Sequence, residues 1–476
     1  MKIAIAGATG FVGKELSKSL AQRYTVFALS RNPLPKELDE QKQIFWKKCD
    51  LHNQKQVELS LDEADCAIYL IHSMLPNLRL NQGTFDDFDM SLADNFGRAA
   101  KLAGVKRIIY LSGLIPEEVQ LSLHLKSRLE VETALRFYYR NLTVLRAGII
   151  AGDGGSSFTI VYNLVKRLPV MICPAWTHHR TSIITLNDTV NSLEHCIEAK
   201  ETAGKTFDIG STENLTYVDI MRKTAEHLKL KRKFITVPWF TLNLSRLWVS
   251  LISGAPKSLV YPLVQSLRHA MVVRQDHRLI IPQHSFARVD DILKAVLGTY
   301  AHSNPHAFKK PKFSLSWYGS VRSIQRMPLP EGKSAQWLAD RYVNWLAAYL
   351  PWMIQASRRN GRVQLTLPYL KIVLLSFSYS PVRSSRDRIL YYIDGGVLAS
   401  KKNTKGRIEF RKIPPGHTSG LVAIHDFVPA LPWFIYRYTQ AKIHYGIMRA
   451  FRRYLQRYSK KRARSYKVLN KVRFAD

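Results

Sequence analysis

Three glycines near the start of the chain have the spacing of a phosphate-binding turn. Gly7, Gly10 and Gly13 follow an apolar run at residues 3–6 and precede a stretch whose apolar residues recur with helical period. Such glycines permit a tight turn and let the backbone approach a pyrophosphate without an intervening Cβ. The N–H groups and the dipole at the helix N-terminus then favour phosphate oxygens. The motif predicts a dinucleotide site, and a glycine-rich turn without a ligand is the alternative.

His124 and Arg128 form a second group whose types and spacing could do chemistry. They are four residues apart, so a helix would bring both side chains to one face. Histidine can act as a general acid because its ordinary pKa lies near neutrality. Arg128 stays charged and offers a wide fork of donors to ribose or phosphate oxygens. The pair predicts either a proton-transfer site or a site that only binds a cofactor.

The spacing Gly7-Ala-Thr-Gly-Phe-Val-Gly13 resembles the nucleotide loop of the extended and atypical short-chain dehydrogenase/reductase superfamily, in its NmrA/epimerase-like branch. The likeness continues through Leu145-Arg-Ala-Gly148 to about residue 297. More narrowly, the chain resembles uncharacterised bacterial NAD(P)-binding proteins with an extra C-terminal domain. The superfamily uses a Ser and a Tyr-x-x-x-Lys pair, and here a His and an Arg stand in place of the Tyr and Lys. The catalytic candidates that the resemblance implies are Ser112, His124 and Arg128.

The end of the second predicted strand favours NADP(H) over NAD(H). An acid there would bond a ribose 2′-hydroxyl, whereas an arginine pairs with a 2′-phosphate. Ser30-Arg31 occupies this position without an adjacent acid, and a charge-assisted bond to phosphate contributes about 1.5–3 kcal/mol. A solvated surface arginine is the alternative.

The other predicted cofactor contacts come from the glycine loop, from strand ends and from the resemblance. The resemblance places Asp50 and Leu51 beside the adenine, although Asp50 could equally be a turn former. The end of the fourth predicted strand should lie along the cofactor. The full predicted set is Gly7, Thr9, Gly10, Phe11, Val12, Gly13, Arg31, Asp50, Leu51, His72, Ser73 and Arg128.

The elements that must position these residues alternate along the first 300 residues. Short apolar runs with strand character alternate with helical patterns, as in a doubly wound α/β fold with a parallel sheet of Rossmann type. The expected strands are residues 3–6, 24–30, 43–51, 65–74, 107–113, 142–152 and 206–210, and helices are expected at 86–102 and 217–230.

Residues 239–252 contain an apolar helical stripe of Trp239, Phe240, Leu244, Leu247, Trp248, Leu251 and Ile252. Most such stripes are core or a domain interface, and a membrane-facing role is the alternative. The apolar stretches at 238–255 and 365–379 are shorter than the roughly 20 residues that a spanning helix needs, although the first could lie on a bilayer. Four widely spaced cysteines predict a reduced, cytoplasmic protein, and no metal site is expected.

The net charge of +35 is concentrated in the C-terminal part. Residues 301–476 hold 33 Lys and Arg against 7 Asp and Glu, a surplus of +26. This surplus predicts an anionic lipid surface as a partner, with peripheral attachment to the inner face of the membrane. Nucleic acid is the weaker option because no RNA- or DNA-binding motif accompanies the charge. The alternative is that the positive charge serves only to keep the protein soluble.

The expected domains are a Rossmann domain at 1–300 with a substrate-side C-terminal part, a linker at 301–312, an α+β domain at 313–460 and a basic tail at 461–476. Short strands and a long helix at about 433–460 predict a mainly antiparallel sheet, and closure of that sheet on the helix would resemble helix-grip domains. Two functions remain open: an NADPH-dependent reductase or isomerase acting on a hydrophobic carbonyl compound, and a non-catalytic NADP(H)-sensing scaffold.

Overall fold

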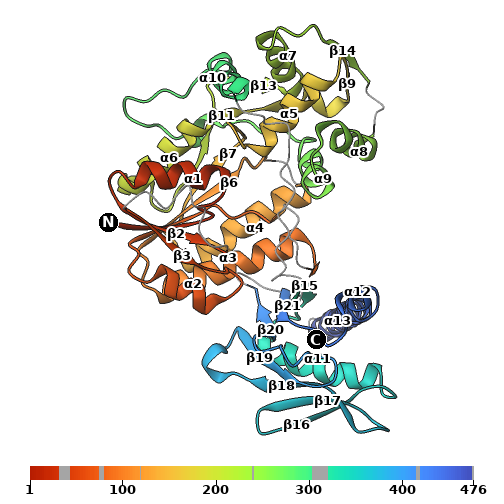
Figure 1. Ribbon diagram of the computed structural model, residues 1–476. Helices are drawn as coiled ribbons and strands as arrows, with labels where there is room; N and C mark the ends of the chain where they lie inside the picture. Colours follow the sequence, from red (N-terminus) through yellow and green to blue (C-terminus); the bar gives the residue numbers. More distant parts are fainter. Residues whose placement is uncertain are drawn as a thin grey trace. The chain divides into compact units, whose positions relative to one another are not determined.

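The chain folds around two sheets, each in its own unit (Figure 1). The computed structural model describes residues 1–31, 43–73, 80–117, 120–237, 241–302, 320–413 and 419–473. Unit 1 comprises Met1–Pro76 and Leu92–Lys310, and unit 2 comprises Asn77–Ser91 and Pro311–Asp476. Unit 2 therefore includes a short segment from the first hundred residues, which the sequence patterns do not assign to it. Most of the predicted linker, at 303–312, lies outside the described residues.

Unit 1 is built on a parallel sheet of seven described strands in the order β12-β7-β6-β4-β1-β2-β3. The predicted Rossmann-type fold is thus confirmed. The chain order reverses beside β1, and in such sheets ligands bind at the carboxyl ends of the strands next to this reversal. The strands are β1 (Lys2–Ala6), β2 (Thr25–Ser30), β3 (Ile44–Lys48), β4 (Cys66–Tyr69), β6 (Arg107–Gly113), β7 (Thr143–Ala147) and β12 (Thr206–Ile209).

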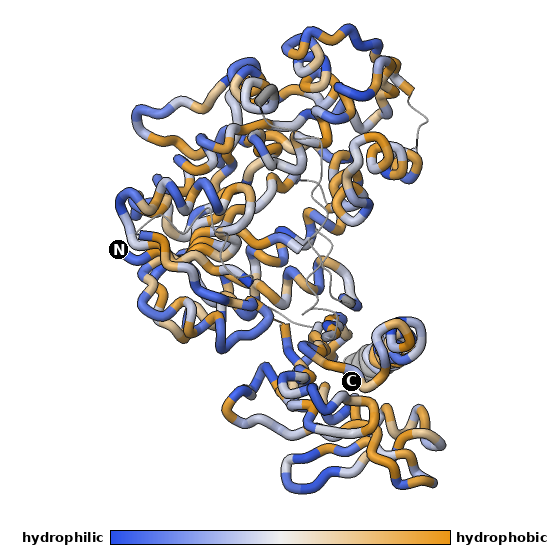
Figure 2. Tube along the Cα trace, viewed as in Figure 1, coloured by the Kyte–Doolittle hydropathy of each residue, from blue (hydrophilic) through white to orange (hydrophobic). Residues whose placement is uncertain are grey.

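Helices cover both faces of this sheet, which explains why its central strands are apolar on both sides (Figures 1 and 2). One face carries α1 (Phe11–Leu20) and α6 (Leu186–Glu198). The other face carries α2 (Gln54–Leu61), α3 (Phe85–Leu102) and α4 (Leu123–Tyr138).

The rest of unit 1 forms a second layer of short elements beyond β7. Short strands pair as β8 (Ile149–Ala151) with β11 (Ile183–Thr185), β9 (Val170–Cys173) with β14 (Lys233–Thr236), and β10 (Arg180–Thr181) with β13 (Leu215–Thr216). The helices are α5 (Ser156–Arg167), α7 (Tyr217–His227), α8 (Leu242–Ser253), α9 (Lys257–Ser266) and α10 (Val289–His302).

Unit 2 is built on a mainly antiparallel sheet in the order β16-β17-β18-β19-β20-β21-β15-β5. The edge strand β5 (Leu80–Gln82) pairs in parallel with β15 (Val321–Pro328), so the early segment completes the sheet. The other strands are β16 (Gln355–Arg359), β17 (Arg362–Leu367), β18 (Ile372–Tyr379), β19 (Arg388–Gly395), β20 (Arg407–Lys412) and β21 (Ser419–Phe427).

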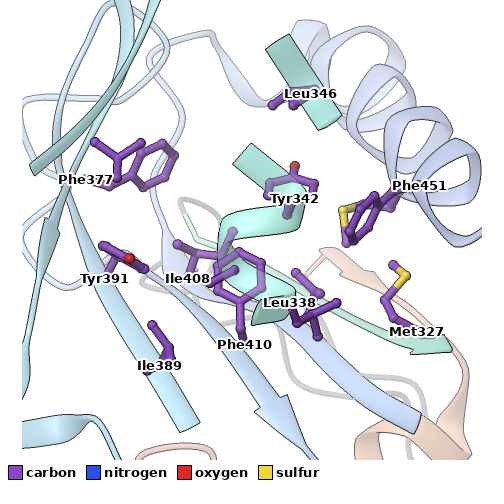
Figure 3. Packing of buried hydrophobic residues seen from close by; sticks show 14 of the residues in the cluster. Met327, Leu338, Tyr342, Leu346, Phe377, Ile389, Tyr391, Ile408, Phe410 and Phe451 are labelled. Atoms are coloured by element: carbon purple, nitrogen blue, oxygen red, sulfur yellow. The ribbon is translucent and has the colours of Figure 1, made fainter. Parts of the chain in front are cut away.

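Helices α11 (Ala335–Tyr349), α12 (Trp433–Tyr438) and α13 (Gln440–Arg473) contribute to the apolar core of unit 2. Figure 3 shows Tyr342 of α11 between Phe410 of β20 and Phe451 of α13. Side chains alternate along β20, so Arg407, Glu409 and Arg411 belong to the opposite face of the sheet, where they form buried ion pairs.

The predicted antiparallel C-terminal sheet and long terminal helix are confirmed. Two boundaries differ from the prediction. The helix expected at 433–460 breaks at Thr439, and α13 then continues to Arg473 through the stretch that was predicted as a basic tail. A run of basic residues does not by itself end a helix, since Lys and Arg are good helix formers.

Candidate functional site

The glycine loop has the shape that a pyrophosphate needs. Gly7 has a φ of +97°, which favours glycine. A Cβ on Gly13 would lie 2.1 Å from the Gly7 carbonyl oxygen, so only glycine lets α1 start this close to the loop. Gly10, by contrast, is exposed, and a Cβ there would meet only the Gly7 oxygen at 3.1 Å. A side chain at Gly10 would therefore fill the open space beside the loop in which a pyrophosphate would lie.

The N-terminus of α1 is open to an anion. Its N-cap is Gly10, which has no side chain to accept from the first amides, and its first turn contains no acidic residue. Thr9 is exposed, while Phe11 and Val12 are half-buried. The helix dipole and these amides favour a phosphate group at this position.

The residues predicted to contact the adenosine follow strand ends at the same edge of the sheet as the glycine loop. Ala6 at the end of β1 pairs with Leu29 near the end of β2, so the glycine loop and Arg31 both follow the carboxyl ends of neighbouring strands. Arg31 is exposed. Asp50 accepts the His52 N–H through Oδ1, at 3.1 Å, and its carbonyl accepts from Asn53, so it shapes the turn before α2. Leu51 is buried, with 6% of its surface exposed.

A cavity of about 390 Å³ opens at the carboxyl ends of β4, β6 and β7. Its lining includes Phe11 of the glycine loop, Ser112 and Arg128, and most of the other lining side chains are apolar. Among the apolar lining residues are Leu111, Ile149, Ile160, Trp176, Val249, Leu259, Val260 and Leu263. Such a space suits a hydrophobic molecule with one polar end.

Two histidines meet inside this cavity. His124 lies on α4, and His72 follows β4 at the cavity wall with an accessible surface. Their Nε2 atoms are 3.3 Å apart, and their ring planes differ by only 8°. The ring centroids are 5.3 Å apart, farther than the two Nε2 atoms, so the rings approach each other through the hydrogen bond between these atoms. One ring must donate and the other accept.

The hydrogen-bond chain continues behind His124. Its Nδ1 lies 3.1 Å from Ser266 Oγ of α9, and Ser266 Oγ lies 2.8 Å from Ser122 Oγ. Ser122 is the N-cap of α4 and accepts the Leu125 N–H. The four side chains thus form a continuous path of exchangeable protons that ends at His72 in the cavity.

Both imidazoles are held neutral, which corrects the expectation of an imidazolium acid. Burial and the Arg128 charge lower the pKa of His124 to about 3. Desolvation within the cavity, Arg128 and His124 hold the pKa of His72 well below its ordinary value. A guanidinium and a low-dielectric cavity both oppose a second positive charge. Any proton that leaves this pair near pH 7 must leave a neutral ring.

Ser112 lines the cavity but its proton is committed. Its hydroxyl donates to Glu132 Oε1 at 2.8 Å. Glu132 is buried and also accepts two bonds from Arg146, at 3.1 and 2.6 Å. The expected proton relay through Ser112 would have to break this network, so Ser112 offers a ligand its lone pairs. Sequence patterns did not single out Glu132, and Ser122 and Ser266 were likewise missed because nothing local marks them.

No group of three or more His, Cys, Asp or Glu that could hold a metal ion occurs within the described ranges. In the same parts of the chain, no helix is both long and apolar enough to cross a membrane.

Comparison with known proteins relates the glycine loop and the elements around it to NAD(P)H-binding proteins. Residues 7–161 match a family model described as NAD(P)H-binding. Over 112 residues the chain is 34% identical to the auxiliary protein GraX of Staphylococcus aureus, which covers 24% of this chain and 36% of GraX. The chain thus spans about a third of the length of that relative. It is 26% identical to a ceramide reductase of Caulobacter vibrioides over 246 residues, 50% of this chain and 73% of the relative.

Solved structures share the fold of unit 1. A nucleoside-diphosphate-sugar epimerase from Staphylococcus aureus is 16% identical, with a TM-score of 0.50, and the match covers 62% of this chain and 100% of that one. A triphenylmethane reductase from Citrobacter sp. is 17% identical, also with a TM-score of 0.50, over 63% of this chain and 100% of that one. At such identities the likeness concerns the fold alone.

Proposed function

We propose that this protein, whose residues 7–161 match a family model described as NAD(P)H-binding, is an NADPH-dependent reductase of the atypical short-chain dehydrogenase/reductase type that acts on a hydrophobic carbonyl compound. The observation that carries the proposal is the apolar cavity of about 390 Å³, into which two histidines and Arg128 are built. An apolar wall binds the body of such a substrate, and the few polar groups orient its carbonyl.

The glycine loop would hold the cofactor pyrophosphate through the amides at the start of α1, as its open N-cap allows. Arg31, just past β2, would pair with a 2′-phosphate, and Arg128 would hold ribose or phosphate oxygens. When bound, a reduced nicotinamide supplies the hydride.

The proton would come from the histidine pair. His72 Nδ1–H would give its proton to the substrate oxygen, and His72 Nε2 would then accept from His124 Nε2–H across 3.3 Å. His124 Nδ1 would in turn accept from Ser266, Ser266 would accept from Ser122, and Ser122 would regain a proton from solvent, so that no serine is left as an alkoxide. Each ring changes tautomer and neither becomes charged, which suits a site where Arg128 keeps both pKa values low.

Activity against a panel of hydrophobic aldehydes, ketones and quinones, followed by NADPH consumption, tests this function. His72→Gln and His124→Gln should each lower kcat by about 10²–10⁴, the usual effect of losing a general acid. His227→Gln on α7 is the matched control, because His227 lies outside the cavity and pairs with Asp290. Full activity of both cavity variants on a verified substrate would rule out this proton path.

A second function, non-catalytic NADP(H) sensing, is favoured by one observation. The position of the family tyrosine carries His124, whose pKa of about 3 means that no imidazolium is present to act as a general acid at neutral pH. In that case NADPH should bind with a measurable affinity in calorimetry, no carbonyl compound should be turned over, and the cavity variants should change stability only.

A further inference from the structure

Helix α8 has its polarity reversed with respect to an ordinary surface helix. Its buried residues are mainly serines, namely Ser245, Ser250 and Ser253, together with Val249. Its exposed residues include three leucines, Leu244, Leu247 and Leu251, with 47%, 47% and 76% of their surfaces exposed. These positions are three and four apart, so the leucines form one outward stripe. Of the two expected roles, core or domain interface, a core position does not apply to these three leucines. Trp239 and Phe240 lie outside the described residues.

The inner face of α8 is fixed to unit 1 by hydrogen bonds. Trp176 Nε1 donates to Ser245 Oγ at 3.1 Å, and Asn163 Nδ2 donates to the Ser253 carbonyl at 2.8 Å. Ser250 Oγ donates to the Ala255 carbonyl at 2.9 Å. These bonds hold the serine face inward, so the leucine stripe must face outward in this fold. Figure 2 shows the hydrophobic colouring along α8.

The Asp, Glu, Lys and Arg positions in the sequence around α8 are all occupied by Lys or Arg. Residues 227–275 contain eight Lys and Arg and no Asp or Glu. One of them, Arg246 on α8 itself, lies over the Tyr261 ring of α9, at 5.8 Å from the ring centroid. An exposed apolar stripe in a stretch of chain whose charged residues are all basic is complementary to an anionic lipid bilayer, in which acyl chains lie beneath negative headgroups.

The same two helices also form a wall of the cavity. Val249 projects from the inner side of α8, and Leu259 and Leu263 of α9 line the same space. The outward leucines and the inner lining are thus opposite sides of a single helical layer. A bilayer in contact with α8 would lie next to the wall of the substrate cavity.

We propose that α8 docks unit 1 on an anionic membrane surface, with Leu244, Leu247 and Leu251 inserted among the lipids. The helix has 12 residues, so it lies in the interface. If the proposed reductase function holds, the substrate reaches the cavity from the bilayer, which makes it a membrane-resident lipid with a carbonyl group. The docking step itself does not depend on turnover.

A fluorescent probe at the leucine stripe tests the docking. In a Leu251→Cys variant of the full chain, an environment-sensitive nitrobenzoxadiazole label reports insertion, because the four native cysteines are buried. Leu59→Cys on α2 is the matched control, since Leu59 is also an exposed helical leucine of unit 1, at 61%. With vesicles of equal phosphatidylglycerol and phosphatidylcholine, emission at position 251 should shift to the blue and the control should not change. Pure phosphatidylcholine should give a weaker shift.

Three outcomes would overturn the proposal. The protein could sediment with the vesicles while the probe at 251 stays in water, which would assign binding to another surface such as the basic end of α13. It could fail to sediment at all. The probe could also shift without vesicles as protein concentration rises, which would make α8 a contact between two copies. None of these readouts uses cofactor or substrate, so they are independent of the reductase assay.

Replacing the stripe provides the second measurement. Leu244→Ser, Leu247→Ser and Leu251→Ser together should weaken partition onto the anionic vesicles by at least about tenfold, given the transfer energy of leucine. A Leu59→Ser and Leu102→Ser variant, which removes two exposed leucines elsewhere in unit 1, should bind as the wild type does. Equal loss in both variants would also contradict the assignment to α8.

Discussion

At the scale of single residues, the chemistry of the cavity depends on which protons are free. Ser112 is tied to Glu132, and Glu132 to Arg146, so this network orients the wall at the end of β6. In the histidine pair, by contrast, each ring nitrogen involved faces another exchangeable group. With histidine and arginine in place of tyrosine and lysine, the proposed donor is a neutral imidazole in a relay.

The proposed preference for NADP(H) depends on one arginine. Arg31→Ala should weaken NADPH binding by about tenfold to a hundredfold and leave NADH binding unchanged, because the guanidinium would pair with the 2′-phosphate alone. Titration of both cofactors against wild type and variant measures this. Arg140→Ala is the control, since Arg140 is an exposed arginine of unit 1 beyond the end of α4. Equal affinities for both cofactors in the wild type would refute the preference.

At the scale of elements, the turn between β1 and α1 separates binding from folding. Gly10→Val should abolish cofactor binding while the melting temperature changes little, because the space beside Gly10 is open to solvent. Gly13→Val should instead destabilise unit 1, since its Cβ would overlap the Gly7 carbonyl oxygen at 2.1 Å. Cofactor titration and thermal unfolding of both variants distinguish the two effects. Normal NADPH binding by Gly10→Val would place the dinucleotide elsewhere.

Helix α4 connects the two halves of the proposed site. Its N-cap Ser122 and its first turn carry the relay, and Arg128 follows one turn later. Ser266 at the end of α9 completes the relay, although it lies 142 residues from His124 in the sequence. The site therefore forms only when the substrate-side helices pack against the Rossmann sheet.

At the scale of the whole molecule, both units contain a histidine that is buried in its neutral form. His124 in unit 1 has a pKa of about 3, and burial lowers the pKa of His444 in unit 2 to about 4. His444 Nδ1 is hydrogen-bonded to Gln82 Oε1 of β5, at 3.1 Å, so it helps to hold the early segment against α13. Each unit thus carries its own acid-sensitive contact.

Acid should therefore destabilise the protein in a defined pH window. An unfolded histidine binds a proton near pH 6.5, whereas folded His124 does so near 3. Between these values the unfolded state holds more protons, so stability is complete above about pH 6.5 and falls as the pH is lowered. The expected slope from His124 is about 1.4 kcal/mol per pH unit.

Thermal unfolding at pH 7 and pH 5 measures this dependence. The loss of melting temperature on acidification should be smaller in His124→Gln than in the wild type, because the variant has no ring to protonate. Titrating groups that do not interact with His124 are common to both proteins and cancel in the difference, while His72, whose pKa His124 lowers, changes the difference in the same direction. Identical losses in the two proteins would contradict the neutral, buried state of His124.

The sequence alone determined the features that local patterns encode. The glycine turn, the order of strands and helices and the location of the cofactor edge follow from residue periodicity and turn chemistry within short windows. Arg31 and His124 could be singled out because their positions are defined relative to that turn and to neighbouring strands. Confirmation of the Rossmann-type sheet reflects this locality.

The tertiary structure decided what depends on distant contacts. β5 joins the sheet of unit 2 across more than two hundred residues, Ser266 meets His124, and the leucines of α8 face outward because serines fill its inner contacts. A helical stripe of leucines is the same pattern whether it faces a core or a bilayer, since periodicity defines a face and not its partner. The pKa of His124 likewise could not be predicted from the sequence, because its burial and its proximity to the Arg128 charge depend on how the helices pack.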